Sequence, residues 1–210
     1  MAIYRDRVVP RLINWTCATS GFAPWRAQVC AGLTGRTVEV GFGSGLNIAF
    51  YPLDVTRIFA VEPAKLASKL AARRVATSRV PIDYVGLNGE TLPLGNDSCE
   101  SALITFTLCT IPNAPRALSE LLRVLRPGGQ LHFLEHGLAP QGPTAQWQRR
   151  LEPLQRTLAD GCHLTRNPLA LVKEAGFDVL WSEQRFARGP KPWSYFSVGV
   201  AEKPRTAPRD

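Results

Sequence analysis

The sequence predicts an α/β fold, in which a mostly parallel sheet carries helices on both faces. Apolar runs alternate with segments of helical periodicity through the first two thirds of the chain, which is the pattern of a covered parallel sheet. These runs are continuous rather than alternating, as expected for strands that are buried on both faces. A glycine-rich turn also directly follows the first run. The predicted strands are 37–41, 57–62, 82–86, 101–106 and 129–136.

Helices are expected between these strands, at Leu46–Tyr51, Ala64–Thr77 and Pro115–Leu125. The segment RPGGQ at 126–130 is interpreted as the end of the last helix and a sharp turn into the fifth strand. Proline cannot continue a helix, and glycine accepts positive φ.

The last third of the chain has a different pattern. An amphipathic helix interrupted at Pro153 is predicted for 143–161, and a second helix for 165–177. The final runs at 177–186 and 193–203 are joined by a short Gly/Pro-rich link, which favours an antiparallel pair. Together the patterns predict a Rossmann-like, doubly wound sheet, mostly parallel with an antiparallel C-terminal strand.

A chain of 210 residues with 45% apolar content is expected to form a single domain. The first 30 residues look helical, with Trp15 and Trp25 as apolar anchors. The expected division is an N-terminal helical cover at 1–34, a strand-and-helix core at 35–137, an insertion at 138–168, a C-terminal helix and strand pair at 169–203, and a tail at 204–210.

Composition narrows the class of protein. The net charge is +8, but Lys and Arg are spread along the chain, which argues for ordinary surface chemistry more than for an acidic partner. The five cysteines are scattered without a CxxC pair, as in reduced cytosolic proteins without a disulfide frame or zinc site. No apolar run is long enough for a transmembrane helix, and the first residues do not form a secretory signal. A cytoplasmic location is therefore expected, with the oligomeric state open.

Three glycines, Gly41, Gly43 and Gly45, lie between the first strand and a helix-like segment. Without Cβ atoms they let a ligand approach the main chain, and a helix start adds unpaired N–H groups. The dinucleotide fingerprint G-x-G-x-x-G needs a third glycine where this chain has Leu46. The spacing therefore favours a nucleoside ligand without a pyrophosphate.

Glu62 ends the second predicted strand, 21 residues after Gly41. An acid at about this separation lies beside such a loop and accepts hydrogen bonds from ribose hydroxyls. A solvated strand-end glutamate is the alternative, but the strand, glycine loop and helix around it favour the ligand role.

Four successive segments carry a family resemblance: EVGFGSG, VEP, LNGETLPLGNDSCESALITF and LLRVLRPGGQLHFLEHG. Their order and spacing resemble the motifs of class I S-adenosylmethionine-dependent methyltransferases, over about residues 35–137. The segment LEPLQRTLADGCHLTR at 151–166 is similar to the small-molecule branch that includes thiol S-methyltransferases.

The resemblance implies a set of cofactor contacts. Glu39 would lie near the amino group of the methionine moiety, the three glycines along methionine and ribose, and Glu62 at the ribose hydroxyls. Asn88 and Gly89 stand where the family commonly has Asp-Ala at adenine, so the charge is lost there. The end of the fourth strand, formed by Thr105, Phe106 and Thr107, would face the methyl-bearing sulfur.

Methyl transfer from a sulfonium needs in-line positioning, and it needs a base only when the acceptor must lose a proton. A thiol requires only a modest push, because it ionises a little above neutral pH. His136 at the end of the fifth strand could take the proton, with Glu135 orienting it, and His163 in the insertion is the second choice. A purely structural role stays open for each of the three.

The sequence thus predicts S-adenosylmethionine-dependent methylation of a small, fairly apolar acceptor, with a thiol as the first choice. Methylation of an oxygen or nitrogen of a quinone, phenol or lipid amine remains open, as does a catalytically silent module that only binds the cofactor. A nucleic-acid substrate is disfavoured, since strand four ends in TFTL rather than an NPPY-type tetrapeptide and no RNA-binding domain is added. No metal is expected, and contact of the N-terminal helices with a membrane surface stays open.

Overall fold

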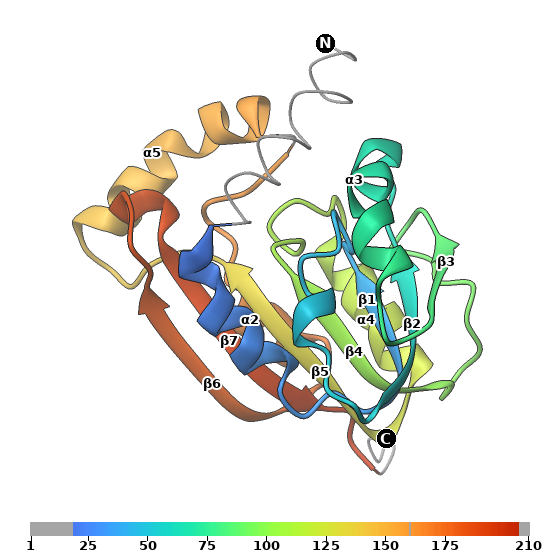
Figure 1. Cartoon of the computed structure of the whole chain (residues 1–210). Coiled ribbons are helices and arrows are strands. Elements are labelled where there is room, and N and C mark those ends of the chain that lie inside the picture. The colour runs from blue at the N-terminus through green and yellow to red at the C-terminus, as the bar shows by residue number, and fades with distance from the viewer. Residues whose placement is uncertain (1–18, 160, 206–210) are drawn as a thin grey trace.

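A computed structural model describes residues 19–159 and 161–205. It contains a seven-stranded sheet with strand order β3-β2-β1-β4-β5-β7-β6 (Figure 1). The strands are β1 (Gly35–Val40), β2 (Val55–Val61), β3 (Ile82–Gly86), β4 (Cys99–Thr105), β5 (Leu125–His136), β6 (Asp178–Phe186) and β7 (Tyr195–Glu202).

The first five strands are parallel, and β7 pairs antiparallel with both β5 and β6. The predicted mixed, doubly wound sheet is therefore confirmed, and β7 is its antiparallel strand, paired between β5 and β6. The strand order reverses direction between β1 and β4. In open α/β sheets this is the point where the carboxyl ends of the strands leave a crevice for ligands.

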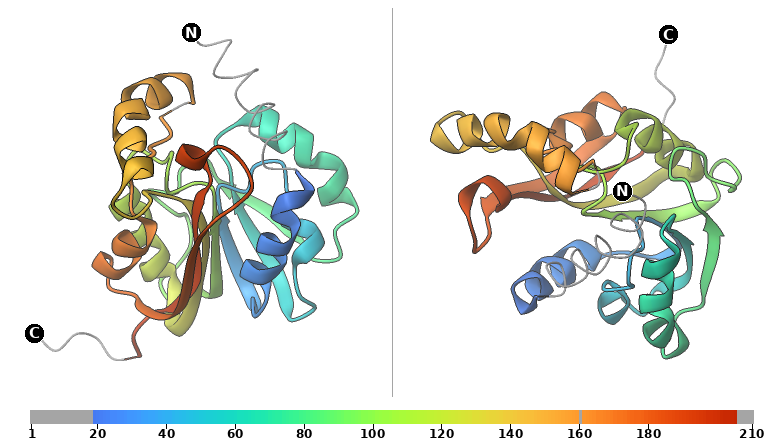
Figure 2. Two further views of the ribbon diagram at one scale, coloured as in Figure 1. Left: turned by 90° about the vertical axis from the view of Figure 1, so that its left-hand side faces the viewer. Right: turned by 90° about the horizontal axis from the view of Figure 1, so that it is seen from above.

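Helices cover both faces of the sheet (Figure 2). They are α2 (Ala23–Cys30), α3 (Lys65–Ala76), α4 (Ala114–Val124), α5 (Pro143–Leu158) and α6 (Pro168–Glu174), with short 3-10 turns η2 (Ser20–Phe22), η3 (Ile48–Phe50) and η4 (Lys191–Trp193). One buried apolar cluster joins the sheet to α4 and α6, and a second joins its other face to α2 and α3. These four helices thus bury their apolar sides against the sheet, which is the main stabilising contribution.

Helices α4 and α6 begin in the same way. The Asn113 side chain accepts a hydrogen bond from Arg116 N at 3.1 Å, and Asn167 accepts one from Ala170 N at 3.1 Å. An asparagine at this position satisfies one of the free N–H groups of the first turn, and a proline in that turn has no N–H to leave unpaired.

Three expectations about local structure need correction. The helix expected at Leu46–Tyr51 is only the 3-10 turn η3, because the glycine turn leaves too few residues before β2. The helix expected to break at Pro153 continues through it as α5. The turn expected at 126–130 lies inside β5 as a bulge, since Cys99 pairs with Leu125 and Ser101 pairs with Gln130.

The N-terminal expectation is tested only from residue 19 onward, where η2 and α2 are helical and Trp25 is buried. Trp15 lies outside the described residues. Within the described ranges, no helix has the length and apolar character needed to span a bilayer.

Candidate functional site

A cleft of about 1000 Å³ opens at the carboxyl ends of β1, β2 and β4, at the reversal of strand order. Nine of the predicted site residues line it: Gly41, Gly43, Glu62, Asn88, Gly89, Thr105, Phe106, Thr107 and His163. The other four, Glu39, Gly45, Glu135 and His136, are not among its lining residues. The sequence pattern therefore gathers most of the expected residues in one place.

Glycine is required at positions 41 and 43 of the glycine loop for two different reasons. Gly41 has φ of +77°, and a Cβ there would lie 1.8 Å from Thr107 Oγ1, so the loop packs directly on the end of β4. Gly43 has φ of +59°, and a Cβ there would meet nothing closer than a backbone oxygen at 3.8 Å. At Gly43 the open space belongs to the cleft, which provides room for a ligand against bare main chain.

Glu62 is held at this loop by two backbone bonds. Its Oε2 accepts from Gly43 N at 2.7 Å, and its Oε1 accepts from Ala64 N at 2.8 Å. Burial raises the pKa of this carboxyl, and the two N–H donors oppose that rise. Each carboxylate oxygen has a further lone pair, so the group can accept one more hydrogen bond on each side.

Glu39 lies beneath the loop, fully buried. Tyr51 Oη donates to its Oε2, and Asn47 Nδ2 donates to its Oε1 at 2.9 Å. Burial raises the pKa of Glu39 to about 7, while both donors counteract the rise. Both oxygens of Glu39 thus accept hydrogen bonds from protein groups, and Asn47, rather than Glu39, lines the cleft.

Arg26 and Asn47 are cleft residues that the sequence did not predict. Arg26 comes from α2 on the N-terminal cover, and its Nη1 donates to Asn47 Oδ1 at 2.5 Å. Asn47 also donates to Thr105 Oγ1 at 3.0 Å. A buried guanidinium beside an amide gives this end of the cleft a positive charge suited to a carboxylate.

The adenine end of the expected site has a turn built on Asn88. Its Oδ1 accepts from Glu90 N at 2.8 Å, which uses one acceptor position of the side chain within the loop. A Cβ on Gly89 would lie 2.5 Å from Val40 Cγ1, so the loop packs on β1 and only glycine fits. Beside Asn88 and Glu90, the cleft lining here includes the apolar side chains of Val40, Leu87 and Ile111, which suit a flat base.

Phe106 follows β4 with φ of +55°, an uncommon backbone conformation for an aromatic residue. Its ring packs edge-on against Phe22 and Phe196, at centroid distances of 5.1 Å and 5.6 Å. Strain of this kind persists only where the surroundings fix it, and it is concentrated at functional sites. The result is an aromatic cluster beside the cleft.

Glu135 supports the segment after β4 from below. Both of its oxygens accept from Thr107 N, at 2.9 Å and 3.0 Å, and the backbone N–H groups of Leu108 and Cys109 also bond to it. Burial raises its pKa to about 8 against those bonds. Glu135 therefore shapes the loop, and the structure does not bring it to the cleft.

His136 and His163 differ in their surroundings. The His136 ring packs on Phe196, its Nε2 lies 3.3 Å from Pro192 O, and burial lowers its pKa. His163 lines the cleft, and its Nδ1 lies 2.6 Å from Glu152 Oε1. Glu152 also accepts from Leu164 N at 2.6 Å, so the imidazole is held in a fixed orientation.

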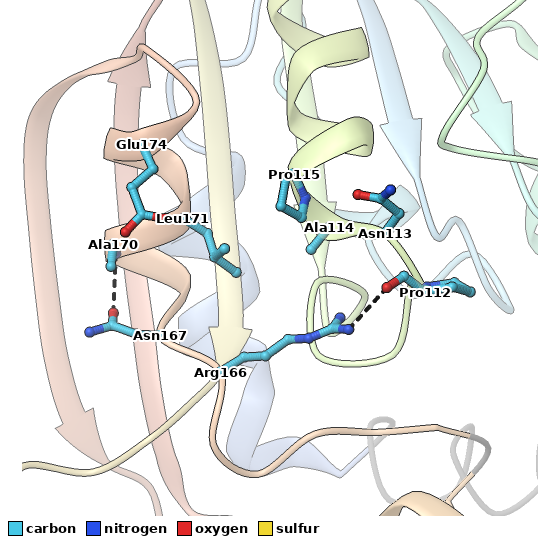
Figure 3. Close-up of a pocket in the computed structure, with 9 residues that line it drawn as sticks. All are labelled: Pro112, Asn113, Ala114, Pro115, Arg166, Asn167, Ala170, Leu171 and Glu174. Carbon is cyan, nitrogen blue, oxygen red and sulfur yellow. Dashed lines mark hydrogen bonds between the residues drawn. The ribbon is translucent and has the colours of Figure 1, made fainter.

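A second hollow of about 440 Å³ lies between the N-terminal ends of α4 and α6 (Figure 3). Arg166 reaches across it and donates to Pro112 O at 3.2 Å, as well as to Leu108 O and Ile111 O at 2.5 Å and 2.6 Å. These bonds satisfy the guanidinium and tie the insertion to the segment after β4. This hollow lacks the glycine loop and Glu62, so the larger cleft is the candidate site.

Comparison with known proteins agrees with this arrangement. Residues 38–133 match the model of the methyltransferase domain family. The chain is 35% identical over 167 residues to the rat thiol S-methyltransferase TMT1B, covering 77% of this chain and 66% of that relative. It is 34% identical over 178 residues to the human TMT1B, covering 80% of this chain and 70% of that protein.

Solved structures show the same fold. A SAM-dependent methyltransferase of Thermotoga maritima superposes with a TM-score of 0.67 at 21% identity, over 96% of this chain and 98% of that one. Geranyl diphosphate methyltransferase superposes with a TM-score of 0.66 at 12% identity, over 86% and 84% of the two chains. The chain therefore belongs to the class I S-adenosylmethionine-dependent methyltransferases and is similar to the thiol S-methyltransferases among them.

Proposed function

We propose that this chain methylates the thiol of a small, apolar molecule, using S-adenosylmethionine as the methyl donor. The observation that carries the proposal is one cleft that holds both the Gly43–Glu62 pair and a fixed imidazole, His163. Relatives at 34% and 35% identity are named thiol S-methyltransferases, which favours sulfur over oxygen or nitrogen as the acceptor atom.

The residues present fit this donor. Glu62 has a free acceptor position on each oxygen for the two ribose hydroxyls, and the open side of Gly43 leaves room for the sugar. Asn88 and Gly89 would border adenine. Arg26 would bind the carboxylate of the amino-acid end, and Asn47, itself bonded to Glu39 and Thr105, would hold the guanidinium in place.

Bound S-adenosylmethionine would supply a methyl group on a cationic sulfur, which an attacking sulfur atom displaces in line. The chain's part is to orient the acceptor and exclude water, and holding two reactants in line removes several kcal/mol of barrier. Thr105 ends β4 and Phe106 and Thr107 follow it; all three line the cleft and would border the reacting atoms. The aromatic cluster around Phe106 supplies apolar surface for the acceptor.

His163 is the proposed proton acceptor. Glu152 accepts from Nδ1–H, which leaves Nε2 as the lone-pair nitrogen. A thiol needs only partial help in losing its proton, so one imidazole is sufficient. Positioned general bases typically contribute about 100-fold to 10,000-fold in rate, and a thiol should lie at the low end of that range.

The test is a methyl-transfer assay on a panel of alkyl and aryl thiols, phenols, quinols, amines and RNA, with products identified by mass. We expect methylation of thiols, strongest for apolar ones. Methylation confined to an oxygen or nitrogen acceptor would contradict the thiol assignment. Binding of the donor with no transfer to any acceptor would instead support a silent cofactor-binding module.

Parallel substitutions separate the two histidines. His163→Gln should lower kcat for a thiol by about 100-fold and leave the affinity for S-adenosylhomocysteine unchanged. Glu152→Gln should lower kcat less, because it weakens only the hydrogen bond that orients the His163 ring. His136→Gln is the matched control outside the cleft lining, and a larger kcat loss there would move the base to His136.

A further inference from the structure

Two cysteines that the proposed reaction does not use lie close together next to residues that line the cleft. Cys109 is in the segment between β4 and α4, and Cys162 follows α5. Both thiols are reduced, and each is close enough to the other to shift its pKa. Cys109 is buried, while Cys162 is partly exposed, so a solution reagent reaches the pair from the Cys162 side.

Backbone bonds hold the two cysteines close. His163 N donates to Cys109 O at 2.7 Å, and Arg166 Nη1 donates to the carbonyls on both sides of Cys109, at Leu108 and Ile111. Standard bond lengths then limit the Cα atoms of Cys109 and Cys162 to at most about 7.5 Å apart. Disulfides commonly span about 4.4–6.8 Å between Cα atoms, so bridging this pair needs little backbone movement.

The two segments form part of the same cleft. Thr107 and Thr110 line it from the segment after β4, and Gly161 and His163 line it from the insertion. The Cys109 thiol also lies 3.5 Å from Thr110 Oγ1. A covalent bond between the cysteines would therefore fix these two parts of the wall to each other.

Disulfide formation requires one thiol that ionises readily and a second thiol that attacks it afterwards, and the two cysteines differ in this way. The hydrogen bond from Cys109, as the largest effect, lowers the pKa of Cys162 to about 7, although burial and Glu152 oppose the change. The same bond and burial raise the pKa of Cys109. Cys162 is thus the accessible thiolate and Cys109 the resolving partner.

We propose that Cys109 and Cys162 form a reversible disulfide that locks the insertion onto the segment after β4 and restrains opening of the cleft. With hydrogen peroxide as oxidant, the Cys162 thiolate attacks one oxygen and becomes a sulfenic acid, releasing water once a proton is added. The Cys109 sulfur then attacks the sulfenic sulfur, the S–S bond forms, the S–O bond breaks and a second water leaves. Two thiols are oxidised, one peroxide is reduced, and a phosphine or a dithiol reverses the change.

The first experiment maps the bond in the full chain. After treatment with hydrogen peroxide, proteolysis without reductant and mass analysis should show the Cys109 and Cys162 peptides joined, with the loss of two hydrogens. Cys99→Ser and Cys17→Ser should keep the bridge, whereas Cys162→Ser should abolish it. A bridge from Cys162 to another cysteine, or oxidation of Cys162 to a sulfinic acid without a bridge, would overturn the proposal.

The second experiment measures the restraint, and this step rests on the proposed cofactor site. Release of S-adenosylhomocysteine from the oxidised protein should be about tenfold slower than from the reduced protein, because opening of the wall limits ligand exit. A phosphine, which is not a thiol acceptor, should restore the fast rate, and peroxide should leave Cys162→Ser unaffected. An unchanged release rate in bridged protein would refute the lock. If the reduced protein does not bind S-adenosylhomocysteine, the proposed function fails, while the peptide map still decides whether the bridge forms.

Discussion

Replacing Glu62 by Gln tests the cofactor site most directly. The carboxylate uses one lone pair on each oxygen for Gly43 N and Ala64 N, at 2.7 Å and 2.8 Å, and the proposed site uses the remaining lone pair on each for a ribose hydroxyl. The amide has a single accepting oxygen, so Glu62→Gln removes the charge and at least one hydroxyl contact. A hydrogen bond to a charged group contributes about 1.5–3 kcal/mol. We therefore expect S-adenosylhomocysteine to bind roughly 10-fold to 150-fold more weakly.

Calorimetric titration gives the affinity, and two further measurements show where the loss arises. 5′-Methylthioadenosine keeps the ribose and lacks the amino-acid end, so its binding should weaken by the same factor. Thermal unfolding of the free variant reports any damage to the loop. Glu120→Gln is the matched control, because that carboxylate also accepts a backbone bond, from Leu92 N at 2.7 Å, away from the cleft. An affinity of Glu62→Gln within twofold of the parent protein would refute the ribose assignment.

The affinity should also depend on pH with a defined sign. Burial raises the pKa of Glu62 above that of a free glutamate. The accepting carboxylate is therefore lost at a higher pH than it would be in solution. Binding of S-adenosylhomocysteine should be strongest above that raised pKa and weaken as the pH falls through it, and Glu62→Gln should remove this dependence.

Three other perturbations follow from the same geometry. Gly41→Ala should reduce the free energy of unfolding by about 2–4 kcal/mol in urea titration, because the new Cβ meets Thr107 Oγ1 at a positive φ. Gly43→Ala should reduce the free energy of unfolding by only about 1–2 kcal/mol and should act mainly on ligand affinity. Equal stability losses in the two variants would contradict the open space at Gly43. Arg26→Met should weaken S-adenosylhomocysteine about tenfold and leave 5′-methylthioadenosine unchanged in the same titration, and equal losses for both ligands would place Arg26 elsewhere. Burial raises the folded-state pKa of Glu135 to about 8, so its contribution to stability is full below the unfolded pKa and is lost as the pH rises toward 8. Glu135→Gln should flatten this decline in stability, measured by urea titration at a series of pH values. An unchanged decline would show that other groups cause it.

The sheet was predictable because its signal is local. Five continuous apolar runs predicted five parallel strands within a few residues of β1 to β5, and the Gly/Pro link predicted the antiparallel pair β6 and β7. The errors arose where tertiary contacts override local pattern. Pro153 continues within α5, where the pattern alone predicted a break, and residues 126–129 are accommodated as a bulge within β5.

The position of the cleft was predictable where it depends on spacing along the chain. Glu62 and the glycine loop follow consecutive strands of a parallel sheet, so their meeting at one edge follows from topology. Arg26 and Glu152 could not be found in this way, because each reaches the cleft region from a helix distant in sequence. The family resemblance implied that Glu39 lies near the amino group of the methionine moiety, whereas its position inside an apolar strand indicates partners within the protein. A charge inside a continuous apolar strand must find partners within the protein, and here the partners are Tyr51 and Asn47.

The three buried carboxylates at the ends of β1, β2 and β5 show how the chain separates support from binding. Glu39 and Glu135 use their oxygens on protein donors, and both have raised pKa values, so each stabilises a loop at the expense of buried charge. Glu62 alone of these three combines two backbone bonds with a place in the cleft lining. A ligand that supplies two hydroxyl donors to Glu62 offsets part of its desolvation. Binding of the cofactor and order in the glycine loop should therefore be coupled, so that hydrogen exchange at Gly43 N slows when S-adenosylhomocysteine is bound and remains fast in Glu62→Gln.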